Sequence, residues 1–238
     1  MIDKGDYTGQ WDNLKDGKKL VRAGYDAVAD DYLATRLTPS EDEMADVHLL
    51  QELFVRLSPG ALVLDAGCGA GVPVARLLQK RYRVVGVDFS QGQLALARSL
   101  VPEARFVCQD MTALGFAPNS FDAICSYYAI IHIPRDEHAR VLQHFYTILK
   151  PDGLALLCFG SSDSPTHLEE DYFGAPMYWS HFDAQANLEI VSASGLNVVW
   201  SRLIPDALWP ESSHLFVCLL YTSPSPRDRT RSRMPSSA

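Results

Sequence analysis

Short apolar runs alternate with stretches of helical periodicity through the middle of the chain. Turn residues bound five of these runs, which have the length of buried strands. They are ALVLDA (61–66), RVVGVD (83–88), ARFVCQ (104–109), FDAICSY (121–127) and LALLCFG (154–160). Helices are expected between them, at 72–81, at 90–100 and from Pro134. Because strands that alternate with helices build parallel sheets, the pattern predicts an α/β fold with helices on both faces of its sheet.

The segments before the first strand also have helical patterns. Residues 17–35 predict a helix that places Tyr25 and Tyr32 on one face. A second helix is expected to begin at Ser40, where Glu43 completes a capping box, and to end before Pro59. Its apolar stripe consists of Val47, Leu50, Phe54 and Leu57.

The pattern changes again after residue 160. Residues 161–182 predict a long connection that is rich in aromatic side chains, which favours an ordered, functional loop. These side chains are Tyr172, Phe173, Tyr178, Trp179 and Phe182. A helix is expected from Asp183 to Ser194, ending at Gly195. The runs at 196–204 and 213–220 then pair as two further strands.

Composition narrows the function classes. The chain has 238 residues, 47% of them apolar, which suits one domain with a sizeable core. A formal net charge of −8 argues against nucleic-acid binding and favours a small-molecule partner. The five cysteines are scattered singly, so neither disulfides nor a metal site is expected. No export signal or membrane-spanning run is evident, which predicts a cytoplasmic protein, and the oligomeric state is left open.

The last residues differ in composition from the rest of the chain. Residues 222–238 have no apolar periodicity and carry four Arg against one Asp, which is typical of a disordered basic tail. The segment CLLYTSPSPRD (218–228) also resembles the translation of a sequencing-library adapter. We therefore expect a domain over 1–217 and a non-native or disordered tail over 218–238.

One glycine-rich segment carries the chemistry. VLDAGCGAG (63–71) ends a buried strand with Asp65 and continues with Gly67, Gly69 and Gly71 before a helix. Glycines let the backbone pass close under a ligand, and a helix start offers unpaired N–H groups. The next strand ends at Asp88, whose carboxylate suits the two hydroxyls of a ribose. This combination predicts a nucleotide-like ligand, although the glycines alone also fit a tight turn.

These residues resemble the class I S-adenosylmethionine-dependent methyltransferases, particularly the UbiE-like, or type 11, group. The likeness extends from about Tyr25 to Val217 and includes Asp88 in GVDFS, Asp110 in QDM and the turn LKPDG (149–153). It implies a three-layer Rossmann-like methyltransferase fold with a mostly parallel seven-stranded sheet in the order 3-2-1-4-5-7-6. It also implies S-adenosylmethionine as cofactor, and an N-terminal helical lid.

The resemblance further implies roles for individual residues around the cofactor. Asp65 orients the methionine ammonium, Asp88 binds the ribose, Asp110 contacts the adenine, and Tyr25 lies near the methionine carboxylate. Phe89 and Met111 pack on the adenine faces. The fourth-strand motif FDAICSYYAIIHI adds Ser126 and Tyr127 to the cofactor site. For Asp65 a capping role stays open, and for Phe89 and Met111 ordinary core packing does.

The acceptor side is less specific. The resemblance places His132 near the acceptor, as the candidate catalytic base, and a structural histidine bonded to a carbonyl is the alternative. Tyr128, Tyr178, Trp179 and His181 are the other candidates for the pocket, since aromatic faces suit a planar or cationic group. The acidic run at 169–171 fits either a cationic acceptor or solvated surface.

Methyl transfer is an in-line displacement that depends on positioning, so a general base is needed only when the acceptor must lose a proton. The sequence thus predicts methyl transfer to an O, N, C or S atom of a small molecule. An NAD-linked oxidoreductase and a catalytically silent cofactor-binding module remain the alternatives. The G-x-G-x-G spacing after Asp65 disfavours the oxidoreductase.

Overall fold

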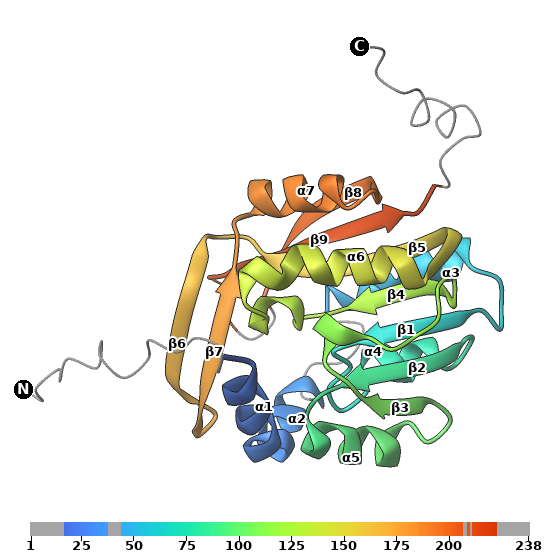
Figure 1. Cartoon of the computed structure of the whole chain (residues 1–238). Helices are drawn as coiled ribbons and strands as arrows, with labels where there is room; N and C mark the ends of the chain where they lie inside the picture. The colour runs from blue at the N-terminus through green and yellow to red at the C-terminus, as the bar shows by residue number, and fades with distance from the viewer. Residues whose placement is uncertain (1–16, 38–43, 207–208, 210, 223–238) are drawn as a thin grey trace, which may run out of the picture.

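A seven-stranded sheet forms the centre of the computed structural model, which describes residues 17–37, 44–206, 209 and 211–222 (Figure 1). Its strands are β1 (Leu62–Ala66), β2 (Arg83–Asp88), β3 (Arg105–Cys108), β4 (Phe121–Ser126), β5 (Leu149–Gly160), β8 (Asn197–Pro205) and β9 (Ser213–Leu220). Their order is β3-β2-β1-β4-β5-β9-β8, with β1 to β5 parallel and β9 antiparallel to both neighbours. Since β8 and β9 are the sixth and seventh strands of this sheet, the predicted order 3-2-1-4-5-7-6 is confirmed.

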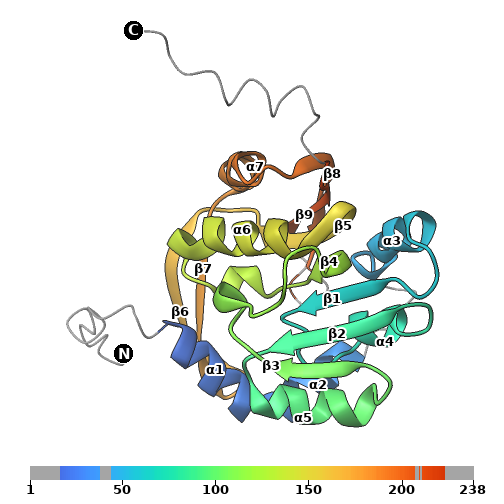
Figure 2. The ribbon, with the colours of Figure 1, turned by 45° about the vertical axis from the view of Figure 1, so that its right-hand side comes forward.

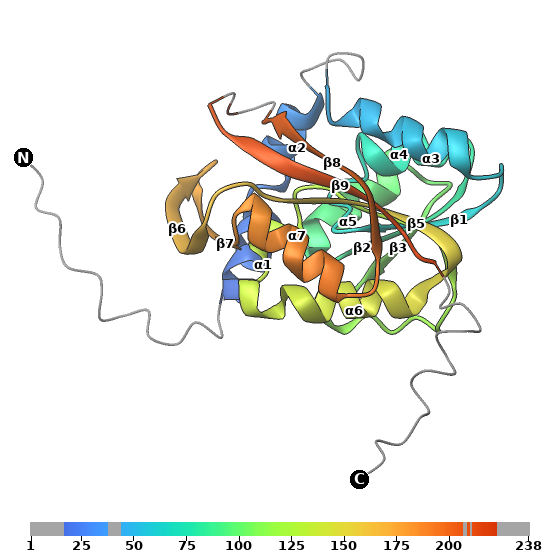
Figure 3. The ribbon, with the colours of Figure 1, turned by 90° about the horizontal axis from the view of Figure 1, so that it is seen from above.

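Helices cover both faces of the sheet. α3 (Gln51–Arg56) and α4 (Val74–Leu78) lie on one face, and α6 (His138–Ile148) and α7 (Ala184–Ala193) lie on the other (Figure 3). Alternate residues of each central strand enter different cores. Val63 of β1 packs under α3 and α4, whereas Leu64 packs under α6, and both are fully buried. The predicted three-layer α/β architecture is confirmed.

Local sequence signals account for several helix boundaries. Ser90 caps α5 (Gln91–Leu100) by accepting a hydrogen bond from the Gln93 N–H, and Asp183 caps α7 in the same way from Ala186. Gly195 follows α7 with a φ of +88°, the left-handed conformation that ends many helices. Figure 2 shows α5 beside β3, at the edge of the parallel strands.

The N-terminal helical region is interrupted. The expected helix over 17–35 is two helices, α1 (Gly17–Ala27) and α2 (Ala29–Leu37), which meet at Val28. Asp26 of α1 accepts hydrogen bonds from the Ser90 hydroxyl and the Gly92 N–H at the start of α5. These contacts attach the helices near the end of β2. Tyr25 and Tyr32 share a face as expected, with ring centroids 5.2 Å apart.

The expectation of a long connection over 161–182 was wrong. Most of these residues form a two-stranded antiparallel sheet of β6 (Ser164–Tyr172) and β7 (Ala175–His181). Two residues with positive φ, Phe173 (+53°) and Gly174 (+96°), make the turn. β6 is polar and largely exposed, while β7 buries two adjacent residues as well as alternate ones, so neither strand has a clear period of two.

The β6–β7 hairpin packs against α1 and extends beyond the carboxyl ends of the parallel strands (Figure 1). Val21 of α1 is buried together with Tyr172, Met177 and Tyr178 of the hairpin. The two glycines of α1 permit this approach. A Cβ atom at Gly24 would lie 2.8 Å from the Pro176 carbonyl oxygen, and one at Gly17 would lie 2.9 Å from the Tyr178 ring.

Other boundaries also differ from the sequence prediction. The helix expected over 72–81 is regular only at Val74–Leu78, and α3 follows a 3₁₀ turn at Val47–Leu50. The capping box at Ser40 and Glu43 lies outside the described residues. The LKPDG turn is an irregular stretch inside β5, where the pairing with β4 jumps from Leu149 to Leu154.

The final strand includes residues that the sequence analysis assigned to the tail. Cys218 and Leu219 are fully buried and pair with both β5 and β8. Residues 223–238 lie outside the described part of the chain, so the origin of the 218–238 segment stays a prediction. Among the helices of the described residues, none combines the length and apolarity needed to cross a membrane.

Candidate functional site

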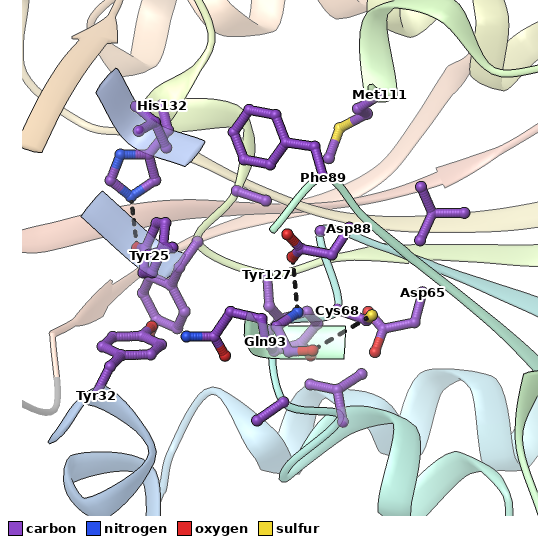
Figure 4. A pocket seen from close by; sticks show the side chains of 18 of the residues that line it. Tyr25, Tyr32, Asp65, Cys68, Asp88, Phe89, Gln93, Met111, Tyr127 and His132 are labelled. Carbon is purple, nitrogen blue, oxygen red and sulfur yellow. Dashed lines mark hydrogen bonds between the residues drawn. The ribbon is translucent and has the colours of Figure 1, made fainter. Parts of the chain in front are cut away.

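A cavity opens at the carboxyl ends of β1, β2 and β4, where the glycine turn leads into α4 (Figure 4). In α/β folds this edge of a parallel sheet is where ligands bind. α1 and α2 form the wall opposite the sheet. We call this space the first cavity. All but two of the predicted cofactor residues line it, the exceptions being Gly71 and Ser126.

The glycine turn forms the floor of the first cavity. Gly67, Gly69 and Gly71 have φ values of +76°, +51° and +76°, which L side chains rarely adopt. At Gly67 space is limiting as well, because a Cβ atom would lie 2.1 Å from the Cβ of Ala129. The turn can therefore keep this conformation and pack against Ala129 only with glycine at position 67.

Asp88 ends β2 and points into the first cavity (Figure 4). One carboxylate oxygen accepts a hydrogen bond from the Gly69 N–H and the other from the Ser90 N–H, each at 2.9 Å. Desolvation raises the pKa of Asp88, although these N–H groups oppose the shift. Each oxygen keeps a free lone pair, so the carboxylate can accept two further hydrogen bonds, as from vicinal hydroxyls.

Asp65 and Gln93 carry polar atoms that have no partner among the described residues. Asp65 is 1% exposed and its Oδ2 is unbonded; burial, with the Asp88 charge, raises its pKa to about 7. Both amide atoms of Gln93 are buried and unbonded too. Because buried polar groups are normally satisfied, these atoms indicate a polar ligand. The sequence analysis missed Gln93, which lies in the first turn of α5 beyond the Ser90 cap.

Asp110 follows β3 and is already engaged. It caps the 3₁₀ turn Met111–Ala113 by bonding Thr112, and its Oδ2 lies 3.0 Å from the Lys18 Nζ. Burial by itself would raise the pKa of Asp110. The hydrogen bonds from Thr112 and the Lys18 charge outweigh that effect, so the pKa is lowered. Lys18 of α1 also lies 3.0 Å from Glu137. This link between the N-terminal helix and the sheet edge was not predicted.

Tyr25 and His132 meet between the two halves of the site (Figure 4). The Tyr25 hydroxyl lies 2.9 Å from His132 Nε2, and His132 Nδ1 lies 2.8 Å from the Tyr178 carbonyl oxygen. A carbonyl only accepts, so Nδ1 carries the proton and Nε2 of the neutral ring accepts from Tyr25. Burial lowers the pKa of His132 to about 4. His132 thus lines the cavity and also bonds a carbonyl, so the two interpretations that the sequence left open do not exclude each other.

Three predicted site residues, Gly71, Ser126 and Tyr178, line neither cavity. A Cβ atom at Gly71 would face Val101 and Phe106 instead. The Ser126 hydroxyl donates to the Ala66 carbonyl oxygen at 2.8 Å, so it braces β4 against β1 below the glycine turn. The Tyr178 side chain packs under Gly17 and Val21 of α1, and only its carbonyl takes part in the site, through His132. Tyr127 does line the first cavity, and its hydroxyl donates to the Asp46 carbonyl oxygen.

A second cavity adjoins the first between α2, the β6–β7 hairpin and the β8–β9 connection. The residues common to both cavities are Tyr25, Tyr32, Arg36, Tyr128 and His132. Trp179 and His181 line the second cavity, as predicted for the acceptor pocket, and the Trp179 ring lies 4.1 Å from the His132 ring. A His214–Asp206 pair at 2.8 Å also lines it and was missed.

Comparison with known proteins supports this arrangement. A family model described as a methyltransferase domain matches residues 63–153, which span β1 to the middle of β5. That segment contains the glycine turn, Asp88, Asp110 and His132.

Curated relatives are about a third identical to the chain over the segments that align. The demethylmenaquinone methyltransferase of Renibacterium salmoninarum is 32% identical over 56% of this chain and 55% of its own length. The 2-phytyl-1,4-naphtoquinone methyltransferase of Thermosynechococcus vestitus is 31% identical over 58% of this chain and 67% of its own length. The chain spans about half the length of most curated relatives it matches.

A solved structure shows the same fold. The 1,6-didemethyltoxoflavin-N1-methyltransferase of Burkholderia thailandensis, solved with 1,6-didemethyltoxoflavin and S-adenosylhomocysteine, has a TM-score of 0.67. It is 22% identical, and the match covers 88% of this chain and 90% of that one. The likeness therefore extends well beyond the segment that the family model matches.

Proposed function

Because the chain belongs to the class I S-adenosylmethionine-dependent methyltransferases, we propose that it transfers a methyl group from S-adenosylmethionine to a small-molecule acceptor. The observation that carries the proposal is the pair of adjoining cavities that share Tyr25 and His132. One cavity has the polar groups that suit the cofactor, and the other has room for an acceptor. The relatives' names, which include quinone and aconitate methyltransferases, support a small acceptor.

The residues of the first cavity fit S-adenosylmethionine. The unbonded Oδ2 of Asp65 suits the methionine ammonium, and the free lone pairs of Asp88 suit the ribose hydroxyls. Phe89 and Met111 line the side where the adenine would lie, next to Asp110. Gln93 offers a donor and an acceptor to the middle of the ligand. At Gly69 the nearest atom to an added Cβ is the Gln93 Oε1 at 3.5 Å, so the main chain there is open to the sulfonium portion.

When bound, S-adenosylmethionine supplies a methyl carbon on a sulfonium: the acceptor atom bonds that carbon, the C–S electron pair stays on sulfur, and any acceptor proton must leave. Tyr25 and His132 lie where such a proton could go. Tyr25 can take the proton on its oxygen while it passes its own to His132 Nε2. His132 is neutral at pH 7 and is a weak base, so this pair suits brief proton holding rather than strong deprotonation.

The aromatic side chains around the junction exclude water from the reacting atoms. Tyr25, Tyr32 and Tyr172 pack edge to face or tilted, with centroids 5.2 to 6.3 Å apart. Displacement at a sulfonium depends chiefly on alignment, so rigid walls on both sides of the methyl group are a main contribution of the protein.

Thermal unfolding with matched ligands tests the proposal. S-adenosylhomocysteine should raise the melting temperature in a concentration-dependent way, since a ligand that binds only the folded state stabilises it. NAD⁺ and NADH should not. Stabilisation by the nicotinamide nucleotides alone would favour the oxidoreductase alternative. Formation of S-adenosylhomocysteine with a panel of small acceptors then separates an enzyme from a silent binding module.

A further inference from the structure

The second cavity has two chemically different ends, and we propose that it binds a flat aromatic acceptor whose ammonium group lies at the outer end, away from the reacting atom. The proposal rests on the methyl transfer proposed above, because that function defines which end is inner. The inner end is formed by the five residues shared with the first cavity, and the outer end by the β6–β7 hairpin and the β8–β9 connection.

The inner end disfavours a positive charge. The Arg36 guanidinium lies there, 5.0 Å over the Tyr128 ring and 3.8 Å from the Asp46 carboxylate. The imidazole of His132, also at this end, is neutral above about pH 5 because burial lowers its pKa to about 4. An ammonium group placed here would face a permanent cation, and the cofactor's sulfonium as well. The acceptor should therefore present a neutral or anionic nucleophile at this end.

Three aromatic rings lead from the inner end to the outer end: Trp179 lies beside His132, Tyr172 beside Tyr25 and Tyr32, and Trp209 beside Tyr172. Tyr172 lies between the other two, with its centroid 5.5 Å from that of Trp179 and 5.9 Å from that of Trp209. All three line the second cavity. Trp209 is 36% exposed, which places its end of the row near solvent. Aromatic faces accommodate a flat ring and attract cations, so the row suits an aromatic amine.

Two carboxylates line the outer end of the second cavity. Glu169 of β6 is half-buried and Glu211 is exposed, and both line the second cavity. Neither forms an ion pair within the part of the chain that the structure describes. Asp206, which His214 contacts at 2.8 Å, belongs nearer the inner end, because the His214 ring packs 5.0 Å from the Tyr128 ring. Burial lowers the pKa of His181, so that ring does not offset the negative charge at neutral pH.

The two ends together select among acceptor classes. A polycarboxylate would bring its charge beside Glu169 and Glu211 and is disfavoured. A flat molecule with a phenol, enol or ring nitrogen as nucleophile and an alkylammonium tail matches both ends. Glu169 is then a specificity-determining residue, whereas its neighbour Glu170 is exposed and lines neither cavity.

Three phenols that differ only in the tail test this inference on the full chain. Tyramine carries an ammonium, 4-ethylphenol is neutral and 4-hydroxyphenylacetate carries a carboxylate. Titration calorimetry with saturating S-adenosylhomocysteine should give tyramine a dissociation constant lower than that of 4-ethylphenol by about fivefold or more, with the acid weakest, as expected for a partly screened charge contact. Equal or tighter binding of the acid would overturn the proposal.

Two isosteric variants make the test local. Glu169→Gln should remove most of the tyramine preference and leave 4-ethylphenol binding unchanged, while Glu170→Gln should change neither. Equal loss of the preference in both variants would show that it comes from overall charge and not from the cavity.

The same titrations without S-adenosylhomocysteine separate this proposal from the proposed function. If S-adenosylhomocysteine does not bind but tyramine still binds more tightly than the other two phenols, the proposed methyl transfer fails and the charge assignment stands. If S-adenosylhomocysteine binds and the protein does not prefer tyramine to the other phenols, only the acceptor class is wrong.

Discussion

Three of the nine buried polar side-chain atoms that have no partner in the described chain belong to residues lining the first cavity. They are the Asp65 Oδ2 and both amide atoms of Gln93. Leaving such groups unbonded costs about 1 to 3 kcal/mol each, so their presence at one place marks a ligand site more strongly than the glycines alone do. Asp65 is the most informative of them because its pKa lies in the physiological range.

Asp65 should make cofactor binding depend on pH. Since its pKa is about 7 in the free protein, raising the pH from 6 to 8 ionises it and should strengthen binding of the S-adenosylhomocysteine ammonium. Asp65→Asn should bind more weakly and lose this dependence, as calorimetric titrations across the range would show. An affinity that falls with rising pH, or an unaltered slope in the variant, would contradict the role given to Asp65.

Ionisation of Asp65 strengthens cofactor binding but should lower the stability of the free protein. An Asp with a raised pKa in the folded state binds more protons than in the unfolded chain, so the free protein loses stability from it as pH rises from about 4 to 7. Denaturant unfolding of Asp65→Asn should lack this loss. This readout needs no ligand and serves as an independent control.

Tyr25 is expected to act on turnover more than on cofactor affinity. Removing its hydroxyl in Tyr25→Phe deprives His132 Nε2 of its hydrogen bond and breaks the proton path. For an acceptor that loses a proton, kcat should fall by about 10²-fold, the lower range for general acid–base catalysis. Steady-state kinetics measure this, with Tyr146→Phe, remote from both cavities, as control. Unchanged kcat would remove Tyr25 and His132 from the chemistry.

At the residue scale, the sequence could locate residues whose place in an element constrains their type. Asp88 and the three glycines could be located because a strand end followed by a tight turn constrains residue type. Gln93, Lys18 and the His214–Asp206 pair could not, because their roles arise only when segments distant in sequence meet. Ser126 and Tyr178 line neither cavity, because a strand or hairpin residue can point to either face.

At the scale of elements, the turn between β1 and α4 positions most of the cofactor site. It holds three left-handed glycines, and the N–H of Gly69 fixes the Asp88 carboxylate. The strands could be predicted from buried apolar runs, whereas the β6–β7 hairpin could not, because its polar strand lacks an alternating pattern. Its stability comes from packing on α1, which local sequence does not reveal.

Two glycine substitutions at similar φ values distinguish the cost of backbone strain from the cost of a steric clash. Gly67→Ala and Gly60→Ala both place a side chain at positive φ, +76° and +82°, at a cost of roughly 1 to 2 kcal/mol. Only at Gly67 would the Cβ meet an atom, that of Ala129 at 2.1 Å; at Gly60 nothing lies within 4 Å. Gly67→Ala should therefore lose S-adenosylhomocysteine binding in calorimetry, and Gly60→Ala should keep it. Equal retention by both would show that the turn does not form the floor of the site.

Lys18 should hold α1 in place with little effect on global stability. Its ion pairs with Asp110 and Glu137 are partly exposed, and such pairs contribute about 0.2 to 1 kcal/mol each. Lys18→Gln should speed hydrogen exchange within α1 several-fold and lower the melting temperature only slightly. Arg140→Gln, which removes a different partner of Glu137, is the matched control. Exchange in α1 that is equally slow in both variants would argue against the link.

At the scale of the whole molecule, the sheet supplies one half of the site and the added segments supply the other. The carboxyl ends of β1, β2 and β4 form the cofactor side, while α1, α2 and the hairpin close the space above them (Figures 1 and 4). The sheet order was predictable from the resemblance to a known family, but the shape of the acceptor cavity was not. That cavity depends on the β6–β7 and β8–β9 connections, which the shared fold leaves free to vary.

The account depends most directly on Asp88 binding the ribose of S-adenosylmethionine. Calorimetric titration of the full chain with S-adenosylhomocysteine should show one site per chain, and Asp88→Ala should weaken it by roughly 1 to 3 kcal/mol, the range for hydrogen bonds to a charged group. Circular dichroism should confirm that the variant is folded. An affinity for S-adenosylhomocysteine that Asp88→Ala leaves unchanged would contradict the assignment of the first cavity as the cofactor site.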